Sequence, residues 1–327
     1  GIAGAARALR ARGRHLVSAV TEHHAVLHTL AALKDEGWDV TLLPVDSAGR
    51  VDPREFAAAL RDDTVLATIA YANNEIGTIA PIAQLARLAH ERGVLFHTDA
   101  VQAPAYLPID VRELQVDLLS IAAHKFYGPK GVGALFVREG TPIEALVHGG
   151  GQEFAKRAGT ENVAGIAGMA RALELADSER EATAARAEKM RDRLEALVCE
   201  RLTGVRVNGA GVARLPNNLN LAILGVESDG LIARLDVDGL AVSAGSACAS
   251  GVVEPSHVIG SLGLPPEWLR GVVRLSLGRT TTEEEITRAG DILVGAVAGL
   301  RTAFGFSNQA ERGIVGSRKG TPGGGHF

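Results

Sequence analysis

The sequence predicts an α/β protein with a mostly parallel central sheet and a smaller α+β lobe that follows it in the chain. Short apolar segments alternate with segments of helical spacing through the first part of the sequence, and most of the apolar segments close on polar residues. Near residue 160 the pattern changes to one very long helical segment, after which short apolar segments return. Strands that alternate with helices are typical of a parallel sheet covered by helices on both faces.

The elements of the first part follow from the apolar spacing and from residues that start or stop helices. The expected strands span 15–20, 39–45, 64–71, 94–100, 117–124 and 132–137. The expected helices span 21–37, 52–62 and 81–93, and Gly ends the first and the last of these. Asp52 and Pro53 begin the second helix, as an N-cap and a first-turn residue. Residues 1–15 read as the body of a helix without an N-cap, so we expect a further N-terminal segment in the natural protein.

The second part begins with a helical pattern over 161–202, which is unusually long, so we expect it to bridge two lobes. The further expected elements are strands at 205–209, 217–224, 240–245 and 272–278 and helices at 228–236 and 281–305. We expect a large domain over residues 1–180, a small domain over 181–306 and a disordered, Gly-rich tail over 307–327.

Composition excludes several classes of protein. The net charge of −4 over 327 residues leaves no broad basic field for nucleic acid or an anionic membrane. The two cysteines, Cys199 and Cys248, are too few for a secreted disulfide framework. No apolar run reaches transmembrane length, and no signal peptide opens the chain. We therefore expect a soluble, cytoplasmic protein.

Polar residues concentrate where the predicted strands end, at the edge of a parallel sheet where ligands bind. In SIAAHKFYGPKG, Lys125 closes an apolar run, and an ammonium there is costly to bury unless it is used. A pyridoxal phosphate (PLP) site needs a Lys that forms an imine, an acid that faces the pyridinium nitrogen and a phosphate anchor. Lys125 and Asp99 suit the first two needs, Gln102 could donate to the ring oxygen, and His23 could stack on the ring. These residues also have ordinary interpretations. Lys125 could be a surface lysine that opens a loop, Asp99 could cap a turn, and His23 could be a histidine at a helix end.

A metal site is a weaker interpretation. His24 and His28 stand at i and i+4, a spacing that zinc sites use. The stretch lacks the Glu of H-E-x-x-H, and no Cys or carboxylate cluster completes a ligand set. We expect no metal.

The two cysteines differ in context. Cys248 lies in VSAGSACASGVVEPSH, whose small flanking residues predict a mobile loop, and a thiol there suits a nucleophile that must travel. An inert loop thiol is the alternative. Cys199 lies in LEALVCERL at helical apolar spacing, so we expect it in the core. Arg274 interrupts the apolar run VVRLSLGRT and could clamp a carboxylate, or pair with a neighbouring acid at a strand edge.

Taken in order, seven stretches resemble the NifS/IscS-like cysteine desulfurases, which are PLP enzymes of the class V aminotransferase group. The resemblance covers Gly1 to about Gly305, and its stretches are TEHHAVL, YANNEIGTIAPI, FHTDAVQ, SIAAHKFYGPKGVGALFVR, HGGGQEFAKRAGTEN, AVSAGSACASG and VRLSLGRTTTEEE. It implies the fold of aspartate aminotransferase (fold type I). It also implies an enzyme that takes sulfur from L-cysteine, yields L-alanine and forms a persulfide on Cys248.

The resemblance also implies residue roles. Lys125 would form the imine and carry the Cα proton, Asp99 would face the pyridinium nitrogen, and Gln102 the ring oxygen. His23 would stack on the ring and take part in proton transfer. Asn74 would contact the cofactor and, with Arg274, hold the substrate carboxylate.

His124 and Thr160 would contact the cofactor phosphate, with Thr160 reaching over from the partner of a homodimer. The sulfur would pass to an acceptor protein, an iron–sulfur scaffold or a tRNA-thiolation protein. Two departures stand out: Ala122 replaces a phosphate-binding Ser of the family pattern, and the family's Gly-Ala-Thr phosphate loop belongs to a segment N-terminal to Gly1.

Two alternatives stay open at this point. One is a class V aminotransferase or a selenocysteine lyase, and the other is an inactive truncated homologue that acts as a binding partner.

Overall fold

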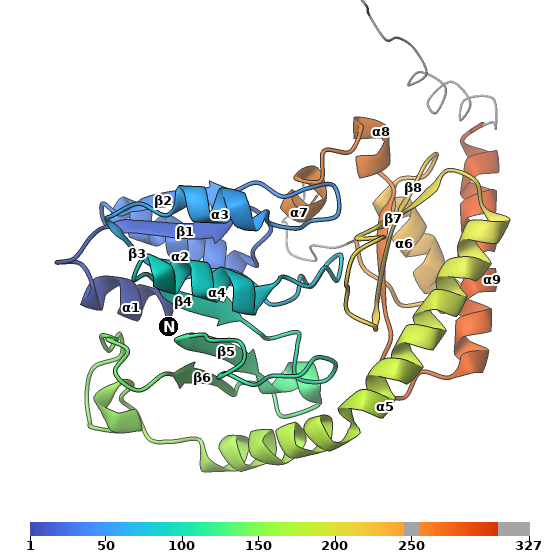
Figure 1. The fold of residues 1–327 in the computed structure, drawn as a ribbon. Helices are drawn as coiled ribbons and strands as arrows, with labels where there is room; N and C mark the ends of the chain where they lie inside the picture. The colour runs from blue at the N-terminus through green and yellow to red at the C-terminus, as the bar shows by residue number, and fades with distance from the viewer. Residues whose placement is uncertain (245–255, 307–327) are drawn as a thin grey trace, which may run out of the picture.

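The computed structural model describes residues 1–244 and 256–306 and is built around a six-stranded sheet (Figure 1). The strand order is β2-β1-β3-β4-β5-β6, in which β1 to β5 run parallel and β6 runs antiparallel to β5. The six strands are β1 His15–Ala19, β2 Asp39–Leu43, β3 Thr64–Thr68, β4 Leu95–Asp99, β5 Leu118–Ala122 and β6 Gly133–Val137. The prediction of a mostly parallel sheet is confirmed.

Helices cover both faces of this sheet. Helices α1 (Ile2–Ala8) and α2 (His24–Asp35) share one buried cluster with Leu16 of β1. Helices α3 (Pro53–Ala59) and α4 (Ile82–Glu91) share another with Val17, the next residue of the same strand. Because successive side chains of a strand point to opposite faces, β1 is apolar on both sides and is buried between the two layers.

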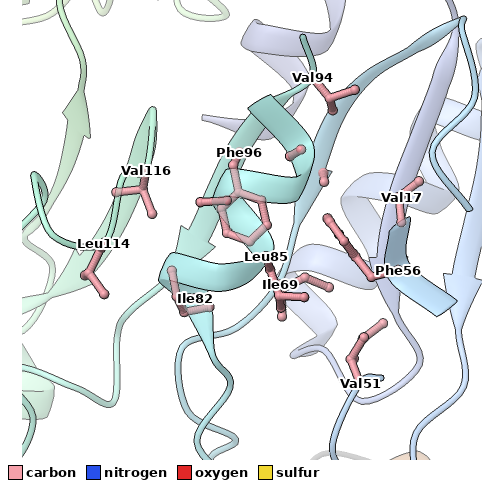
Figure 2. Close-up of a cluster of buried hydrophobic side chains, with 14 of the residues drawn as sticks. Val17, Val51, Phe56, Ile69, Ile82, Leu85, Val94, Phe96, Leu114 and Val116 are labelled. Atoms are coloured by element: carbon pink, nitrogen blue, oxygen red, sulfur yellow. The ribbon is translucent and has the colours of Figure 1, made fainter. Parts of the chain in front are cut away.

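The core between the sheet and helices α3 and α4 is packed around two aromatic rings (Figure 2). Phe56 of α3 and Phe96 of β4 meet edge to face, with ring centroids 6.1 Å apart. Val17, Ile69 and Leu85 belong to the same cluster. This packing fixes the helices on the strands and so fixes the loops that leave the strand ends.

A second, antiparallel sheet follows in the order β7-β8-β9. Its strands are β7 Val205–Asn208, β8 Asn218–Ile223 and β9 Val272–Ser276. The helices around it are α6 Ser228–Val237, α7 His257–Gly260, α8 Pro266–Leu269 and α9 Glu283–Ala303. The predicted strand at 240–245 is wrong for the residues described, because only Ser243 forms a single bridge, to Arg274.

Helix α5 (Val163–Arg201) is 39 residues long and lies against both cores (Figure 1). Met169 and Ala172, near its start, pack on the cluster that contains Phe126, whereas Met190, near its end, lies in the core of the second sheet. The bridging helix expected from the sequence is therefore present. At about 1.5 Å per residue it is roughly 58 Å long.

The loop after β3 joins the two sheets. The N–H of Ile79 donates to the carbonyl of Ala213 over 2.9 Å, and the N–H of Leu215 donates to the carbonyl of Gly77 over 2.7 Å. The predicted tail over 307–327 lies outside the described residues. Among the helices of the described ranges, none is both long and apolar enough to cross a membrane.

Candidate active site

The sequence-predicted polar residues lie on loops that leave neighbouring parallel strands at one edge of the sheet. The strands in question are adjacent in the order β1-β3-β4-β5. The residues that follow them are His23 after β1, Asn74 after β3, Asp99 and Gln102 at the end of β4, and His124 and Lys125 after β5. This edge is the ligand-binding edge of open α/β sheets.

Asp99 is fixed by the strands on both sides of it. Its carbonyl accepts the N–H of Tyr71 over 2.9 Å, and the next N–H, that of Ala100, donates to the carbonyl of Ser120 over 2.9 Å. Its Oδ1 accepts the N–H of Val101 over 2.9 Å. Burial raises the pKa of the Asp99 carboxyl, although this bond and the nearby His23 act in the opposite direction. A cation placed against this carboxylate would favour its ionised form.

His97 cross-links the strands beneath Asp99. Its Nδ1 lies 2.7 Å from Thr68 Oγ1 of β3, and its Nε2 lies 2.9 Å from Ser120 Oγ of β5. Burial, with a smaller effect from the N-terminal charge, lowers the pKa of His97 to about 3. The imidazole is therefore neutral at neutral pH and serves as a hydrogen-bonding tie between three strands.

Lys125 lies on a short 3-10 helix, η1 (Ala123–Phe126), which begins directly after β5. Ala123 and Phe126 are buried on either side, and Tyr127 ends the turn in the left-handed conformation with a φ of 66°. The side chains of His124 and Lys125 are exposed. The sequence argument assumed that the Lys125 ammonium is buried, and this is wrong. What favours Lys125 as a site residue is its position directly after the end of β5.

His23 is the N-cap of α2, and its Nδ1 accepts the N–H of Ala25 over 3.1 Å. This bond fixes the ring at the helix start and leaves the other nitrogen free of the helix. Its side chain is exposed, and that of Gln102 is half-buried. The N-cap contact of His23 is the ordinary alternative considered for it, and the charge of His23 acts on Asp99.

Arg274 reaches this edge from the second sheet. It lies on β9, and its guanidinium donates to the backbone carbonyl of Asn74 over 3.0 Å. Among the residues that the structure describes, its Nε is buried without a hydrogen-bond partner, and burial lowers its pKa despite the opposing charge of Glu75. A buried donor without an acceptor is a site that an incoming carboxylate would satisfy.

Two asparagines of β8, which sequence reasoning missed, hold the same loop. Asn218 Nδ2 donates to the carbonyl of Asn74 over 3.3 Å, and Asn220 Nδ2 donates to the carbonyl of Glu75 over 3.1 Å. Their signal in the sequence is amides at alternate positions of an apolar strand, which places them on one face. The stretch NNLNL carries that pattern.

Glu22 and His257 were also missed. Glu22 is buried beside His23, and His257 Nε2 lies 2.9 Å from the carbonyl of Glu22. A Glu between a buried strand and a helix start is the visible signal for the first. His257 is distant in sequence from Glu22, and no local pattern indicated that the two residues would meet.

The structure describes one of the two cysteines. Cys248 lies outside the described residues. Cys199 is exposed on α5, so its predicted place in the core is wrong. Its neighbour Val198 takes the inward position, and the next residue of a helix is turned about 100° away. Partial burial and the charge of Glu195 raise the pKa of the Cys199 thiol.

Thr160 is exposed on the segment that precedes α5. Ala122, which ends β5, offers no hydroxyl at the position of the family Ser. The rings of His24 and His28 are 5.0 Å apart, and those of His24 and His257 are 4.7 Å apart. Within the described residues no group of three or more His, Cys, Asp or Glu side chains could hold a metal ion.

The comparisons with known proteins agree on a family. Residues 2–289 match the family model described as Aminotransferase class-V. The chain is 49% identical over 308 residues to "Cysteine desulfurase IscS" of Dictyoglomus turgidum, a match that covers 94% of this chain and 78% of that relative. The chain belongs to the cysteine desulfurases of the class V aminotransferase family. The resemblance found in the sequence is confirmed.

Solved structures of relatives share the fold of this class V chain. A NifS-like protein superposes with a TM-score of 0.84 at 35% identity, covering 91% of this chain and 78% of that one. SspA in complex with cysteine superposes with a TM-score of 0.70 at 33% identity, covering 85% and 81% of the two chains. The match to fold type I is thereby confirmed.

PLP is the cofactor of this family, and the donor set at the sheet edge fits its ring. The half-buried carboxylate of Asp99 suits a pyridinium nitrogen, because the cation would offset the effect of burial. The exposed amine of Lys125 follows β5, which is next to β4, and the imidazole of His23 follows β1, which is separated from β4 by β3. The expected cofactor thus has an acid, an amine and a ring partner on this chain.

Proposed function

We propose that this protein converts L-cysteine to L-alanine and carries the released sulfur as a persulfide on Cys248. The observation that supports this most is the guanidinium of Arg274, half-buried beside Asn74 at the sheet edge, whose Nε has no hydrogen-bond partner within residues 1–244 and 256–306. A small amino acid would present its carboxylate there while its amine points towards the loops of Asp99 and Lys125. The relative named "Cysteine desulfurase IscS" and the solved SspA in complex with cysteine are consistent with that substrate.

Several residues would hold PLP. Asp99 would keep the ring nitrogen protonated, Gln102 would donate to the ring oxygen, and His23 would lie against the ring. His124 and Thr160 would contact the phosphate. When bound, PLP supplies an electron sink for the carbon that carries the substrate amine.

The residues of this chain would carry out the remaining steps. Arg274 and Asn74 hold the substrate carboxylate, and the amine of Lys125 takes and returns the proton at the substrate Cα. Lys125 is suited to this because it lies on a turn fixed by buried Ala123 and Phe126. His23, fixed as the N-cap of α2, assists the proton transfer.

The sulfur step requires a nucleophile. The thiolate of Cys248 attacks the sulfur of the substrate, a new S–S bond forms, and the C–S bond of the substrate breaks. The electron pair of the C–S bond stays with the carbon, which then takes a proton to yield L-alanine. Only the thiolate is reactive, so a local rise in the pKa of this thiol would slow the step.

We also propose a cytoplasmic homodimer in which Thr160 of each protomer completes the phosphate site of the other. Around Thr160, Phe154 is 90% exposed and Val163 is 72% exposed, and a partner subunit would bury them. The persulfide would then pass to an acceptor protein of iron–sulfur cluster assembly or of tRNA thiolation.

The test begins with the cofactor. The protein is loaded with PLP and treated with borohydride, and the modified peptide is identified by mass spectrometry. We expect pyridoxyl on Lys125, unchanged labelling in Lys130→Ala and none in Lys125→Ala. Lys130 is a matched control, because it is an exposed lysine near the same turn. Labelling at another lysine, or none in the wild type, would contradict the assignment.

The second stage measures alanine, sulfide and persulfide from L-cysteine. We expect Cys248→Ala to lose persulfide and to lower alanine formation by at least a hundredfold. Cys199→Ala, which changes the exposed cysteine of α5, should match the wild type. Persulfide on Cys199, or unchanged turnover in Cys248→Ala, would overturn the proposal.

A further inference from the structure

Glu22 is a buried carboxyl at the candidate active site. It follows β1, directly before His23, and is 1% exposed. Its Oε1 accepts the N–H of Ala70 over 2.7 Å, which ties the end of β1 to the loop after β3. Its backbone carbonyl lies 2.9 Å from Nε2 of His257, which ties it to α7.

The second oxygen of Glu22 has no hydrogen-bond partner among the described residues. A buried carboxylate that receives only one hydrogen bond is costly, because its charge has lost water without gaining donors. A neutral carboxylic acid avoids most of this cost. The contacts alone therefore favour the protonated form.

The charges nearby act in the same direction. Burial and the negative charge of Asp99 raise the pKa of Glu22 to about 8, against the effect of the Ala70 bond. Glu22 also lines a cavity of about 20 Å³ together with Arg50, whose guanidinium is already paired with Asp46 at 2.8 Å. The titratable groups on the elements next to Glu22 are Asp99 of β4, His23 and His24 of α2, His257 of α7, and Arg50. In the described part of the chain, no cation forms an ion pair with the Glu22 carboxyl.

We propose that Glu22 is a positioning residue, a neutral carboxylic acid that holds the ends of β1 and β3 together beneath His23. This inference rests on the proposed function. A charged carboxylate here would add a second negative charge beside Asp99, raise the pKa of Asp99 and couple the titrations of the two acids. A neutral one fixes the backbone before His23 and leaves the cofactor nitrogen to Asp99.

The first test uses cofactor-free protein and needs no activity. Glu22→Gln copies the protonated side chain, with an oxygen that accepts from Ala70 and no charge. The wild-type folded state holds a proton that the unfolded chain releases above a pKa of about 4.5, so its stability falls as pH rises towards 8. We expect equal Tm values at pH 4, and at pH 9 a Tm of Glu22→Gln on the order of 5 °C above that of the wild type.

The titrations of groups that do not interact with Glu22 are shared by the two proteins and cancel in this difference. A Tm difference that is constant with pH would overturn the proposal. So would one of opposite sign, which would mean that Glu22 is charged in the folded protein.

The second test uses PLP-loaded protein and measures PLP affinity and the pH midpoint of the absorbance of the bound cofactor. We expect Glu22→Gln to stay within about threefold of the wild-type affinity and to keep the midpoint. Glu22→Ala loses the tie to Ala70, and we expect about tenfold weaker PLP binding and a shifted midpoint. Glu22→Asp, one methylene shorter, should resemble Glu22→Ala and replaces it if that variant does not fold.

The outcomes separate the two proposals. If Glu22→Gln is impaired as much as Glu22→Ala, the neutral-acid role is wrong. If the wild type itself does not bind PLP at Lys125, the proposed function fails. The Tm comparison on cofactor-free protein still decides whether Glu22 is protonated.

Discussion

The guanidinium of Arg274 donates to the backbone carbonyl of Asn74 over 3.0 Å, although the two residues are 200 positions apart in the chain. Arg274 belongs to the second sheet, whereas Asn74 follows a strand of the first. Asn218 donates to the same carbonyl over 3.3 Å. The candidate carboxylate site is therefore assembled from both sheets, and its geometry depends on their relative position.

Arg274→Lys tests this site. A lysine cannot both donate to Asn74 and offer two parallel donors to a carboxylate, so substrate binding should weaken. We expect the KM for L-cysteine to rise about ten- to a hundredfold, with a smaller fall in kcat. Steady-state kinetics of alanine formation provide the measurement. Arg270→Lys is the control, because Arg270 is exposed and pairs with Glu227 at 3.5 Å; an equal effect there would contradict a specific role for Arg274.

Phe56→Ala tests the core that carries the site. Phe56 is fully buried and meets Phe96 edge to face, so its loss leaves a cavity next to β4. We expect the free energy of unfolding to fall by about 3–5 kcal/mol in urea titrations. Phe154→Ala removes the same ring at a position that is 90% exposed, and the monomer fold should lose less than about 0.5 kcal/mol. Comparable losses in the two variants would show that the packing around Phe56 is not tight.

His97 gives a pH dependence of stability. Its pKa is about 3 in the folded protein against 6.5 in the unfolded chain, so the unfolded state binds the proton first as pH falls. The contribution of neutral His97 to the free energy of unfolding is therefore complete above pH 6.5 and is lost progressively below it, by about 2 kcal/mol at pH 5. Glu22 acts in the opposite sense over part of this range, so the wild type alone is not informative.

The measurement is the difference between wild type and His97→Gln in urea-induced unfolding at pH 7 and pH 5. His97→Gln removes the titration and keeps a polar group that can reach Thr68 or Ser120. We expect the stability advantage of the wild type to shrink by about 2 kcal/mol between the two pH values. An unchanged difference would mean that folding does not shift the pKa of His97, and a wild-type advantage that grows at pH 5 would mean that His97 is charged in the folded protein.

The start of α9 offers a test of local structure. Thr282 Oγ1 accepts the N–H of Glu285 over 3.2 Å, and the Glu285 carboxylate accepts the N–H of Thr282 over 2.8 Å. Thr282→Ala should cost about 0.5–2 kcal/mol of unfolding free energy, because an orphan N–H loses its acceptor. Thr282→Ser keeps the hydroxyl and should stay within about 0.5 kcal/mol of the wild type in the same denaturant titration. A loss in both variants would point to the Thr methyl group rather than the cap.

The sequence predicted the elements well where local chemistry decides them. Asp52 caps α3 and the capping box at Thr282 begins α9, both visible as short-range patterns. The inner strands β1, β3 and β4 were visible because they are buried on both faces over most of their length and read as apolar runs. Helix α7 was not expected, since its four residues are too few for a periodic signal.

The candidate site was predictable only in part. Loops that follow parallel strands must share an edge, which is why His23, Asp99 and Lys125 could be placed together. The contributions of Asn218, Asn220 and His257 arise from packing between distant segments, and no local rule reports that. Cys199 shows a different error, since it was predicted in the core and is exposed. Apolar spacing in a long helix leaves the inward position uncertain by one residue.

The length of α5 also fixes how the second sheet is rotated relative to the first. Ala172 packs on the cluster that contains Phe126, Met190 lies in the core of the second sheet, and only unbroken helix separates the two residues. A single residue inserted between these points would turn everything downstream by about 100° and advance it by about 1.5 Å. Arg274 would then swing away from Asn74, so this stretch of helix tolerates substitution far better than it tolerates a change in length.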